Sequence, residues 1–279
     1  AEDNRYFCSA DGVLYNKDRT TLLQYPAART GAFTVPDGVT TIGSSAFEWS
    51  ALTEVVLPDG VTRLDFRAFL DCSSLTAISF RGDAPKIAFD AFSGVTATVC
   101  YPVGDSSWTE DVRQNYGGDI TWVEGIPITA SFFPDDAFRS YVADSANGLD
   151  KDGDGCLNAA ELAAVTAIDV RNMGITTLRG VEYFPALEFL YCDKNNLTEL
   201  DVSQNTALEY LWCWENQLTS LDIGSNTALE LLRCENNHLT GLDVSQTASL
   251  TFLLCSGNAI EELDISGCPA LVDVYTNGE

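Results

Sequence analysis

Two unlike internal repeats run through this chain, and they constrain its fold more than any other feature. In the first, Val35-Pro-Asp-Gly-Val39 recurs 22 residues later as Leu57-Pro-Asp-Gly-Val61, and an Ala-Phe pair follows each copy. A looser third copy ends at Ala91-Phe92. A unit of this length cannot bury its apolar face alone, whereas copies stacked in register share a continuous core. The sequence therefore predicts a repeat solenoid.

The second repeat has the pattern Leu-x-x-Leu-x-Cys-x-x-Asn-x-Leu, and its copies begin 21 residues apart at Leu187, Leu208, Leu229 and Leu250. We expect each asparagine to satisfy backbone groups at the turn that follows the strand. The cysteines should form an inward column with neighbours about 4.8 Å apart. Neighbours on parallel strands point the same way, which favours buried thiols, with disulfides as the alternative. These cysteines are Cys192, Cys213, Cys234 and Cys255.

A loop of 12 residues, from Asp150 to Glu161, separates the two repeat regions. Calcium takes six to eight oxygen ligands at roughly 2.3–2.6 Å, and this spacing of acidic residues matches an EF-hand loop. Flanking helices are expected from Pro134 and from Asn158. The predicted Ca²⁺ ligands are Asp150, Asp152, Asp154, the Cys156 carbonyl, Asn158 and Glu161. The alternative is an acidic surface turn that binds no metal.

These motifs carry a resemblance to two families. Residues 33–101 resemble the BspA-like class of bacterial leucine-rich repeats, and residues 165–276 resemble an internalin-like class. The resemblance implies a bacterial interaction protein that is secreted or displayed at the cell surface, and a helical cap before the second array. The expected fold is an α+β repeat protein, with two right-handed, parallel-strand horseshoe solenoids joined by an EF-hand-like cap. The expected domains are residues 1–125, 126–164 and 165–279.

Local patterns add two expectations within the first domain. Apolar positions alternate from Asp11 to Tyr25 around a turn at Asn16 to Arg19, which predicts a capping hairpin. The polar segment from Pro102 to Trp122 favours a short helix around Thr109 to Tyr116.

Strand residues between the inward leucines and cysteines of the second array should face outward on the concave sheet. Many of them are aromatic, which is unusual for a solvated face. Arg233 beside Trp212 suggests a cation–π contact, and Trp, Tyr and Arg dominate interface hot spots. The predicted partner-binding residues are Phe189, Tyr191, Tyr210, Trp212, Trp214, Arg233, Phe252 and Tyr275. The alternatives are rings that merely pack laterally, a carbohydrate ligand, and a passive surface stalk.

Charge and motif content narrow the partners. With 15 basic and 41 acidic residues the net charge is −26, which disfavours nucleic acid. No apolar run reaches the length of a membrane span. The sole histidine, His238, follows a turn and is expected at the surface, and no hydrolase, metalloprotease or phosphate-binding motif is present. We therefore predict a non-enzymatic, monomeric module that binds a protein, with a glycan as the alternative ligand.

Overall fold

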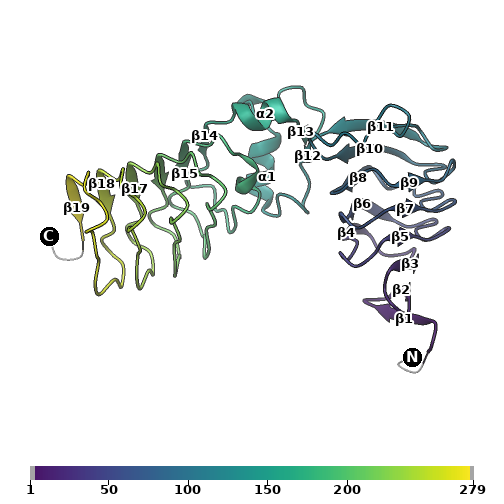
Figure 1. The fold of residues 1–279 in the computed structure, drawn as a ribbon, viewed down its shortest axis with the longest axis horizontal. Coiled ribbons are helices and arrows are strands. Elements are labelled where there is room, and N and C mark those ends of the chain that lie inside the picture. The colour runs from purple at the N-terminus through teal and green to yellow at the C-terminus, as the bar shows by residue number, and fades with distance from the viewer. Residues whose placement is uncertain (1–3, 277–279) are drawn as a thin grey trace. The chain divides into compact units, whose positions relative to one another are not determined.

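The computed structural model describes residues 4–276, and the chain divides into two compact units, Ala1–Pro127 and Ile128–Glu279. It is mostly a β-solenoid repeat with few helices (Figure 1). The expected α+β class is wrong, because residues 4–276 hold 19 strands but only two α-helices, α1 (Asp136–Ala143) and α2 (Ala159–Ala164). The division into three domains stays a prediction.

The first unit consists of two sheets built from successive repeats. One has the order β1-β2-β3-β5-β7-β9 and the other β11-β10-β8-β6-β4. From β3 onward the neighbouring strands of both sheets are parallel, as expected for coils that repeat in one direction. The strands of these sheets are β1 (Phe7–Ala10), β2 (Val13–Asn16), β3 (Thr21–Gln24), β4 (Gly31–Thr34), β5 (Thr41–Ile42), β6 (Leu52–Leu57), β7 (Arg63–Leu64), β8 (Ala77–Phe80), β9 (Lys86–Ile87), β10 (Thr96–Tyr101) and β11 (Asp119–Glu124). A short strand that follows them, β12 (Ile126–Pro127), belongs to neither sheet.

The repeated Ala-Phe pairs form a column in the core of this unit. Phe47, Phe69 and Phe92 are fully buried, and the rings of Phe47 and Phe69 stack with centroids 4.8 Å apart. The backbone follows the same period, because the Phe47 amide donates to the Ala68 carbonyl at 2.8 Å. The 22-residue repeat thus places equivalent side chains one above another.

Two local predictions concern the ends of the first unit: a hairpin at its start and a short helix near its end. Strands β2 and β3 are antiparallel and the Arg19 amide donates to the Asn16 carbonyl, so the predicted hairpin is confirmed. The predicted helix around Thr109 to Tyr116 is wrong, since that segment forms turns. Its side chains instead contribute to the core: Val112 and Tyr116 pack against the buried residues, and the Tyr116 hydroxyl donates to the Val112 carbonyl.

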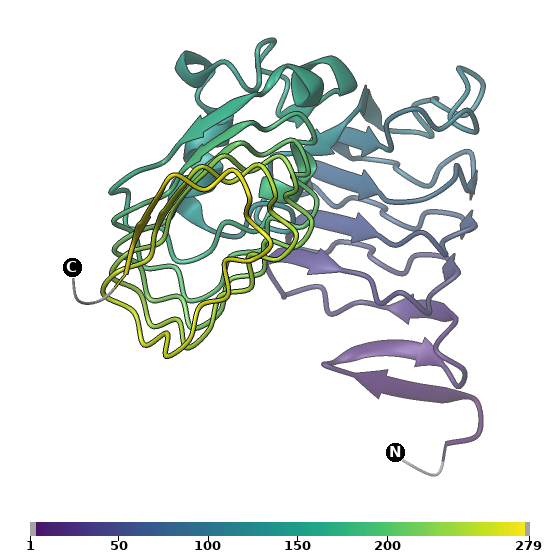
Figure 2. The same cartoon turned by 60° about the vertical axis from the view of Figure 1, so that its left-hand side comes forward.

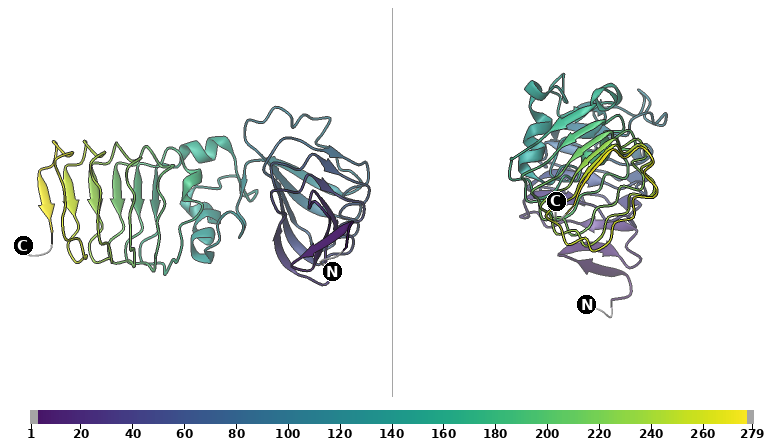
Figure 3. Two further views of the ribbon diagram at one scale, coloured as in Figure 1. Left: turned by 60° about the horizontal axis from the view of Figure 1, so that its bottom comes forward. Right: turned by 90° about the vertical axis from the view of Figure 1, so that its left-hand side faces the viewer.

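The second unit begins with the helices and continues as one parallel sheet of six strands in the order β14 to β19. Figure 3 shows these strands side by side, and in Figure 2 the turns of the coil overlay one another. Three-residue strands suffice because each contributes one inward side chain between two outward ones. The remaining elements are the 3₁₀ turns η1 (Ser145–Asn147) and η2 (Val181–Tyr183) and the strands β13 (Cys156–Leu157), β14 (Ala167–Asp169), β15 (Phe189–Tyr191), β16 (Tyr210–Trp212), β17 (Leu231–Arg233), β18 (Phe252–Leu254) and β19 (Asp273–Tyr275).

The asparagine and cysteine columns of the second unit lie where the repeat places them. The Asn216 side chain accepts from the Leu197 amide and donates to the carbonyls of Cys192 and Cys213, each at 3.0 Å. It therefore joins two successive coils. The four column cysteines are buried free thiols, as predicted, and burial raises the pKa of the Cys213 and Cys234 thiols well above the usual value. They are protonated, unreactive core groups at neutral pH.

A second asparagine column was not predicted. Asn205 and Asn226 are fully buried, and the Asn226 side chain donates to the carbonyls of Val202 and Asn205. The signal was present in the recurring Asn-Thr-Ala-Leu of these repeats.

Candidate functional site

The acidic loop brings its first three predicted ligands together. Carboxylate oxygens of Asp150, Asp152 and Asp154 lie within 4.8 Å of one another. The loop is shaped by its own hydrogen bonds: the Asp150 carboxylate accepts from the amides of Gly153 and Gly155, at 2.8 and 3.2 Å. Folding thus concentrates negative charge at one point.

The remaining predicted ligands belong to the start of α2. The Asn158 side chain caps this helix, and the Glu161 carboxylate accepts from the amides of Lys151 (2.7 Å) and Asn158 (3.0 Å). The predicted capping box is therefore present, and Glu161 is held, nearly buried, against the loop. The preceding helix α1 begins at Asp136 with Asp135 as its cap, close to the predicted start at Pro134.

The loop carboxylates have no cationic counterpart. Burial raises the pKa of Asp150, and the neighbouring charges of Glu161 and Asp152 raise it further. Burial likewise raises the pKa of Asp154. Within residues 4–276, the salt bridges include none of the loop acids. A cluster of this kind fits a divalent cation bound through oxygen.

The predicted aromatic rows lie on the sheet face opposite the core. Strands β15 and β16 bury Leu190 and Leu211 and leave the residues on either side half-buried. Along this face Phe189 stacks on Tyr210 with ring centroids 5.1 Å apart, and Tyr191 meets Trp212 edge-on at 4.9 Å. Of the eight predicted partner-binding residues only Phe252 (38%) and Tyr275 (51%) are largely exposed. The rings are thus less open than expected, because each covers its neighbour.

Cations cover part of the ring surface. The Arg233 guanidinium lies 5.3 Å from the Trp212 ring and 5.0 Å from the Trp214 ring, so the expected contact is confirmed. Arg171 and Lys194 add contacts that were not predicted, at 5.5 Å from Tyr191 and 4.6 Å from Trp214. These three are half of the six basic residues after position 125, a region that also holds 24 acidic residues. Positive charge in this region is therefore concentrated on the aromatic face.

The same face holds polar atoms that nothing in the described chain satisfies. Asp193 is 3% exposed and Glu235 is 8% exposed, and one carboxylate oxygen of each has no hydrogen-bond partner. The indole nitrogens of Trp212 and Trp214 are also buried without a partner. Burial raises the pKa of Asp193, while Arg171, Lys194 and Arg233 oppose that rise. Such groups are uncommon in folded proteins, so their concentration here marks a candidate binding surface.

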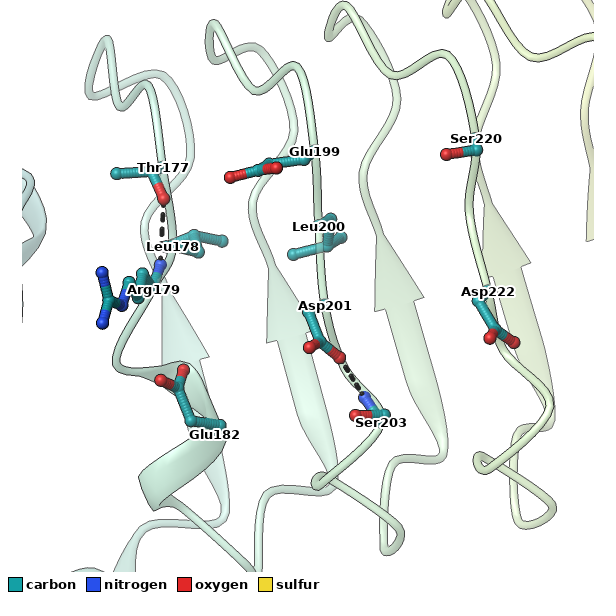
Figure 4. A pocket seen from close by; sticks show the side chains of 10 residues that line it. All are labelled: Thr177, Leu178, Arg179, Glu182, Glu199, Leu200, Asp201, Ser203, Ser220 and Asp222. Atoms are coloured by element: carbon teal, nitrogen blue, oxygen red, sulfur yellow. Dashed lines mark hydrogen bonds between the residues drawn. The ribbon is translucent and has the colours of Figure 1, made fainter. Parts of the chain in front are cut away.

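A separate groove of about 560 Å³ lies on the second unit and is lined by parts of three successive coils. Figure 4 shows four carboxylates in its lining, Glu182, Glu199, Asp201 and Asp222, together with Arg179. Three of these acids accept hydrogen bonds from nearby amides: Glu182 from Gly180 at 2.6 Å, Asp201 from Ser203 at 2.9 Å and Asp222 from Gly224 at 2.9 Å. Among the lining residues, no buried polar atom lacks a partner. Variants of the groove therefore provide controls for tests of binding to the aromatic face.

Two further expectations concern residues outside these surfaces. His238 is exposed, at the turn where it was expected. Across residues 4–276, no helix has the length and apolar content needed to cross a membrane.

Part of the chain is similar to leucine-rich-repeat proteins. Residues 28–101 match the family described as "BspA type Leucine rich repeat region" in six copies. The predicted BspA-like resemblance is confirmed, with more copies than the three recognised in the sequence. Internalin J of Listeria monocytogenes is 42% identical over 75 residues, which are 27% of this chain and 8% of that relative. The internalin-like resemblance is confirmed as well, and the chain spans a small fraction of the relative it matches.

Two solved structures from Listeria monocytogenes are also similar to this chain. The functional domain of InlJ from Listeria monocytogenes, described as including a cysteine ladder, shares 32% identity at a TM-score of 0.38. That match covers 55% of this chain and 43% of the other. Internalin C2 from the same species shares 14% identity at a TM-score of 0.41, over 92% of this chain and 80% of the other.

Proposed function

We propose that the chain is a non-catalytic recognition module that binds a protein partner through the face of β14 to β19. In this account the two repeat arrays are leucine-rich-repeat solenoids, and an EF-hand-like cap precedes the second. The module works as a monomer, and its chemistry is binding alone.

The observation that carries this proposal is the composition of the aromatic face. Four rings of two adjacent repeats, those of Phe189, Tyr191, Tyr210 and Trp212, pack in pairs on one side of the sheet. Trp, Tyr and Arg are the side chains that contribute most to protein interfaces. The acidic unit also places three of its six basic side chains, Arg171, Lys194 and Arg233, against the rings of this face.

Lateral packing of the rings is the competing interpretation, and the half-buried state of each ring favours it. It accounts for the stacked pairs but not for the unpartnered atoms of Asp193 and Glu235. A face whose only role was to stiffen the sheet would be better served by apolar residues than by buried carboxylates that each keep one oxygen unpartnered. We therefore favour a partner surface.

Substitution of Trp212 and Trp214 by alanine tests the proposal. We expect the double variant to lose about 1,000-fold in affinity for a partner captured from host or bacterial surface extracts, because truncated hot-spot aromatics each cost about 2 kcal/mol or more. Phe66→Ala is the matched control, since Phe66 is an exposed ring (42%) in the first unit. Unchanged capture by a double variant that keeps its thermal unfolding curve would refute the proposal.

A carbohydrate ligand is the second candidate, because carboxylates beside aromatic rings are suited to binding sugar hydroxyls while the rings stack on sugar faces. Retention of one sugar class on a glycan array, lost in the Trp212 and Trp214 double variant, would favour it over a protein partner. A passive stalk would retain neither ligand.

We further propose that the loop from Asp150 to Glu161 holds a structural Ca²⁺ ion. The clustered aspartates, the buried Glu161 and the absence of an ion pair to any of them among residues 4–276 support this choice. Asp150, Asp152, Asp154, Glu161, Asn158 and the Cys156 carbonyl would supply oxygen ligands. The ion would neutralise the loop and couple α2 to the start of the repeats.

We infer a secreted or cell-surface location. The internalin and BspA-type relatives support it. Millimolar extracellular calcium would also suit a loop of moderate affinity.

A further inference from the structure

We propose that the aromatic face recognises a cationic protein segment, and that a Lys or Arg side chain of the partner docks at Trp214 between Asp193 and Glu235. This inference rests on the proposed function and specifies its partner. It specifies the charge of the partner, which the aromatic composition of the face does not determine.

The geometry places Trp214 between two carboxylates of neighbouring repeats. The Lys194 amide donates to the Trp214 carbonyl at 3.0 Å, and the Glu215 amide donates to the Glu235 carbonyl at 2.9 Å. These bonds keep Asp193, Trp214 and Glu235 adjacent across three coils. The residues that match Trp214 in the coils before and after it are thus both acidic, an arrangement that favours a cation over the indole.

The acidic groups still have acceptor capacity. Glu235 accepts from the Arg233 guanidinium through one oxygen, at 2.6 and 3.1 Å, and its other oxygen has no partner. Asp193 has no hydrogen bond from another side chain, although it is buried. An ionised carboxylate can only accept, so the group that completes this site must donate. Ammonium and guanidinium groups donate and also neutralise the charge.

The chain's own cations show how a partner's cation would bind. Arg233 lies over both indoles while it donates to Glu235, so one guanidinium satisfies ring and carboxylate together. Lys194, which is exposed, also lies over the Trp214 ring, at 4.6 Å from its centroid, but among the described residues it makes no hydrogen bond to Asp193. Lys194 therefore occupies the approach to Asp193 without satisfying it, and an incoming cation would displace it.

The surroundings of the face also favour a cation. Glu188, Glu209 and Glu230 directly precede strands β15, β16 and β17 and form an acidic row beside the rings. The whole region after position 125 has six basic and 24 acidic residues, a net charge of −18. A field of this sign raises the association rate of a basic partner and repels an acidic one. The unpartnered indole N–H groups of Trp212 and Trp214 also favour a peptide segment, because its backbone carbonyls can accept their hydrogen bonds.

Deca-lysine and deca-glutamate are suitable probes, with binding to the full chain followed by tryptophan fluorescence. We expect deca-lysine to bind, more weakly as salt increases, and deca-glutamate not to bind. Asp193→Asn and Glu235→Gln should each weaken deca-lysine binding at least about tenfold. The matched control is Asp201→Asn with Asp222→Asn, which removes carboxylates in the groove and preserves their amide-accepting oxygens. It should change affinity little.

Lys194→Gln provides a test in the opposite direction. Removal of this competing ammonium should strengthen deca-lysine binding about two- to fivefold, whereas Arg179→Gln, an equal charge change in the groove, should not. A destabilised variant would not bind deca-lysine more tightly. The expected gain in affinity of Lys194→Gln therefore still tests the inference if Asp193→Asn folds poorly.

Equal weakening by the face and groove variants would overturn the inference, because binding would then follow net charge alone. So would retention of a neutral glycan without any response to deca-lysine. Capture of a protein that depends on Trp212 and Trp214, without any binding of deca-lysine, would contradict the preference for a cationic segment. The proposed function would still hold in that case. Unchanged capture from surface extracts by the Trp212 and Trp214 double variant, as described above, would instead remove the proposed function.

Discussion

Asn195→Ala is expected to destabilise the second unit by about 4 kcal/mol. The Asn195 side chain accepts from the amides of Met173 and Ile175, both at 3.0 Å, and donates to the carbonyls of Val170 and Cys192 at 2.8 and 3.0 Å. Alanine would leave these buried groups without partners, and each such group costs about 1–3 kcal/mol when left unsatisfied. Water cannot replace the amide without opening the coil.

The neighbouring Asn196 provides the control. It is exposed, and its side chain makes one long hydrogen bond, 3.3 Å to the Gly174 carbonyl. Asn196→Ala should change stability by less than about 0.5 kcal/mol. Denaturant unfolding, with amide exchange of the second unit as the local readout, compares the two variants. Equal destabilisation would show that the asparagine column does not join the repeats.

Calcium is expected to raise the melting temperature of the second unit by about 5–10 °C at an ion concentration 100-fold above the dissociation constant. Mass action then contributes about 2.7 kcal/mol, and 1 kcal/mol shifts the midpoint of a unit of this size by about 2–4 °C. The physical reason is that the ion relieves repulsion among carboxylates that folding brings within 4.8 Å. Magnesium should stabilise less, because it resists dehydration and demands octahedral geometry.

Asp150→Ala with Glu161→Ala should abolish the response to calcium and to chelator. Glu199→Ala with Glu262→Ala removes the same charge from exposed positions of the second unit and should leave the response intact. The comparison separates metal binding from a general effect of negative charge. Identical melting curves of the native chain with and without calcium would contradict the metal site.

Strict periodicity explains why much of the fold could be predicted. A position that recurs every 21 residues must take the same place in each coil, so the burial of Cys213 and the hydrogen bonds of Asn216 follow from the pattern. The EF-hand spacing likewise located Asp150, Asp152 and Asp154 before their oxygens were seen to converge. Where the period is lost, as around Thr109 to Tyr116, local propensity alone predicted a helix that tertiary packing replaced with turns.

The candidate binding face was predicted only in outline. Alternation along a strand showed that Tyr191 and Trp212 point away from the core, but not that they would cover one another. Exposure depends on side-chain rotamers and on neighbours in the adjacent coil, which a single strand does not encode. Lys194 was missed because it lies past the strand with a backbone φ of 57°, a turn conformation that brings its side chain over Trp214.

Amide hydrogen exchange of the chain, free and with a captured protein partner bound, tests the central claim most directly. The account predicts that protection on binding is confined to residues 189–191, 210–214 and 231–235, with no change in the groove at residues 199–203 and 220–222. Protection that falls on the groove or within the first unit, with the aromatic face unchanged, would contradict it.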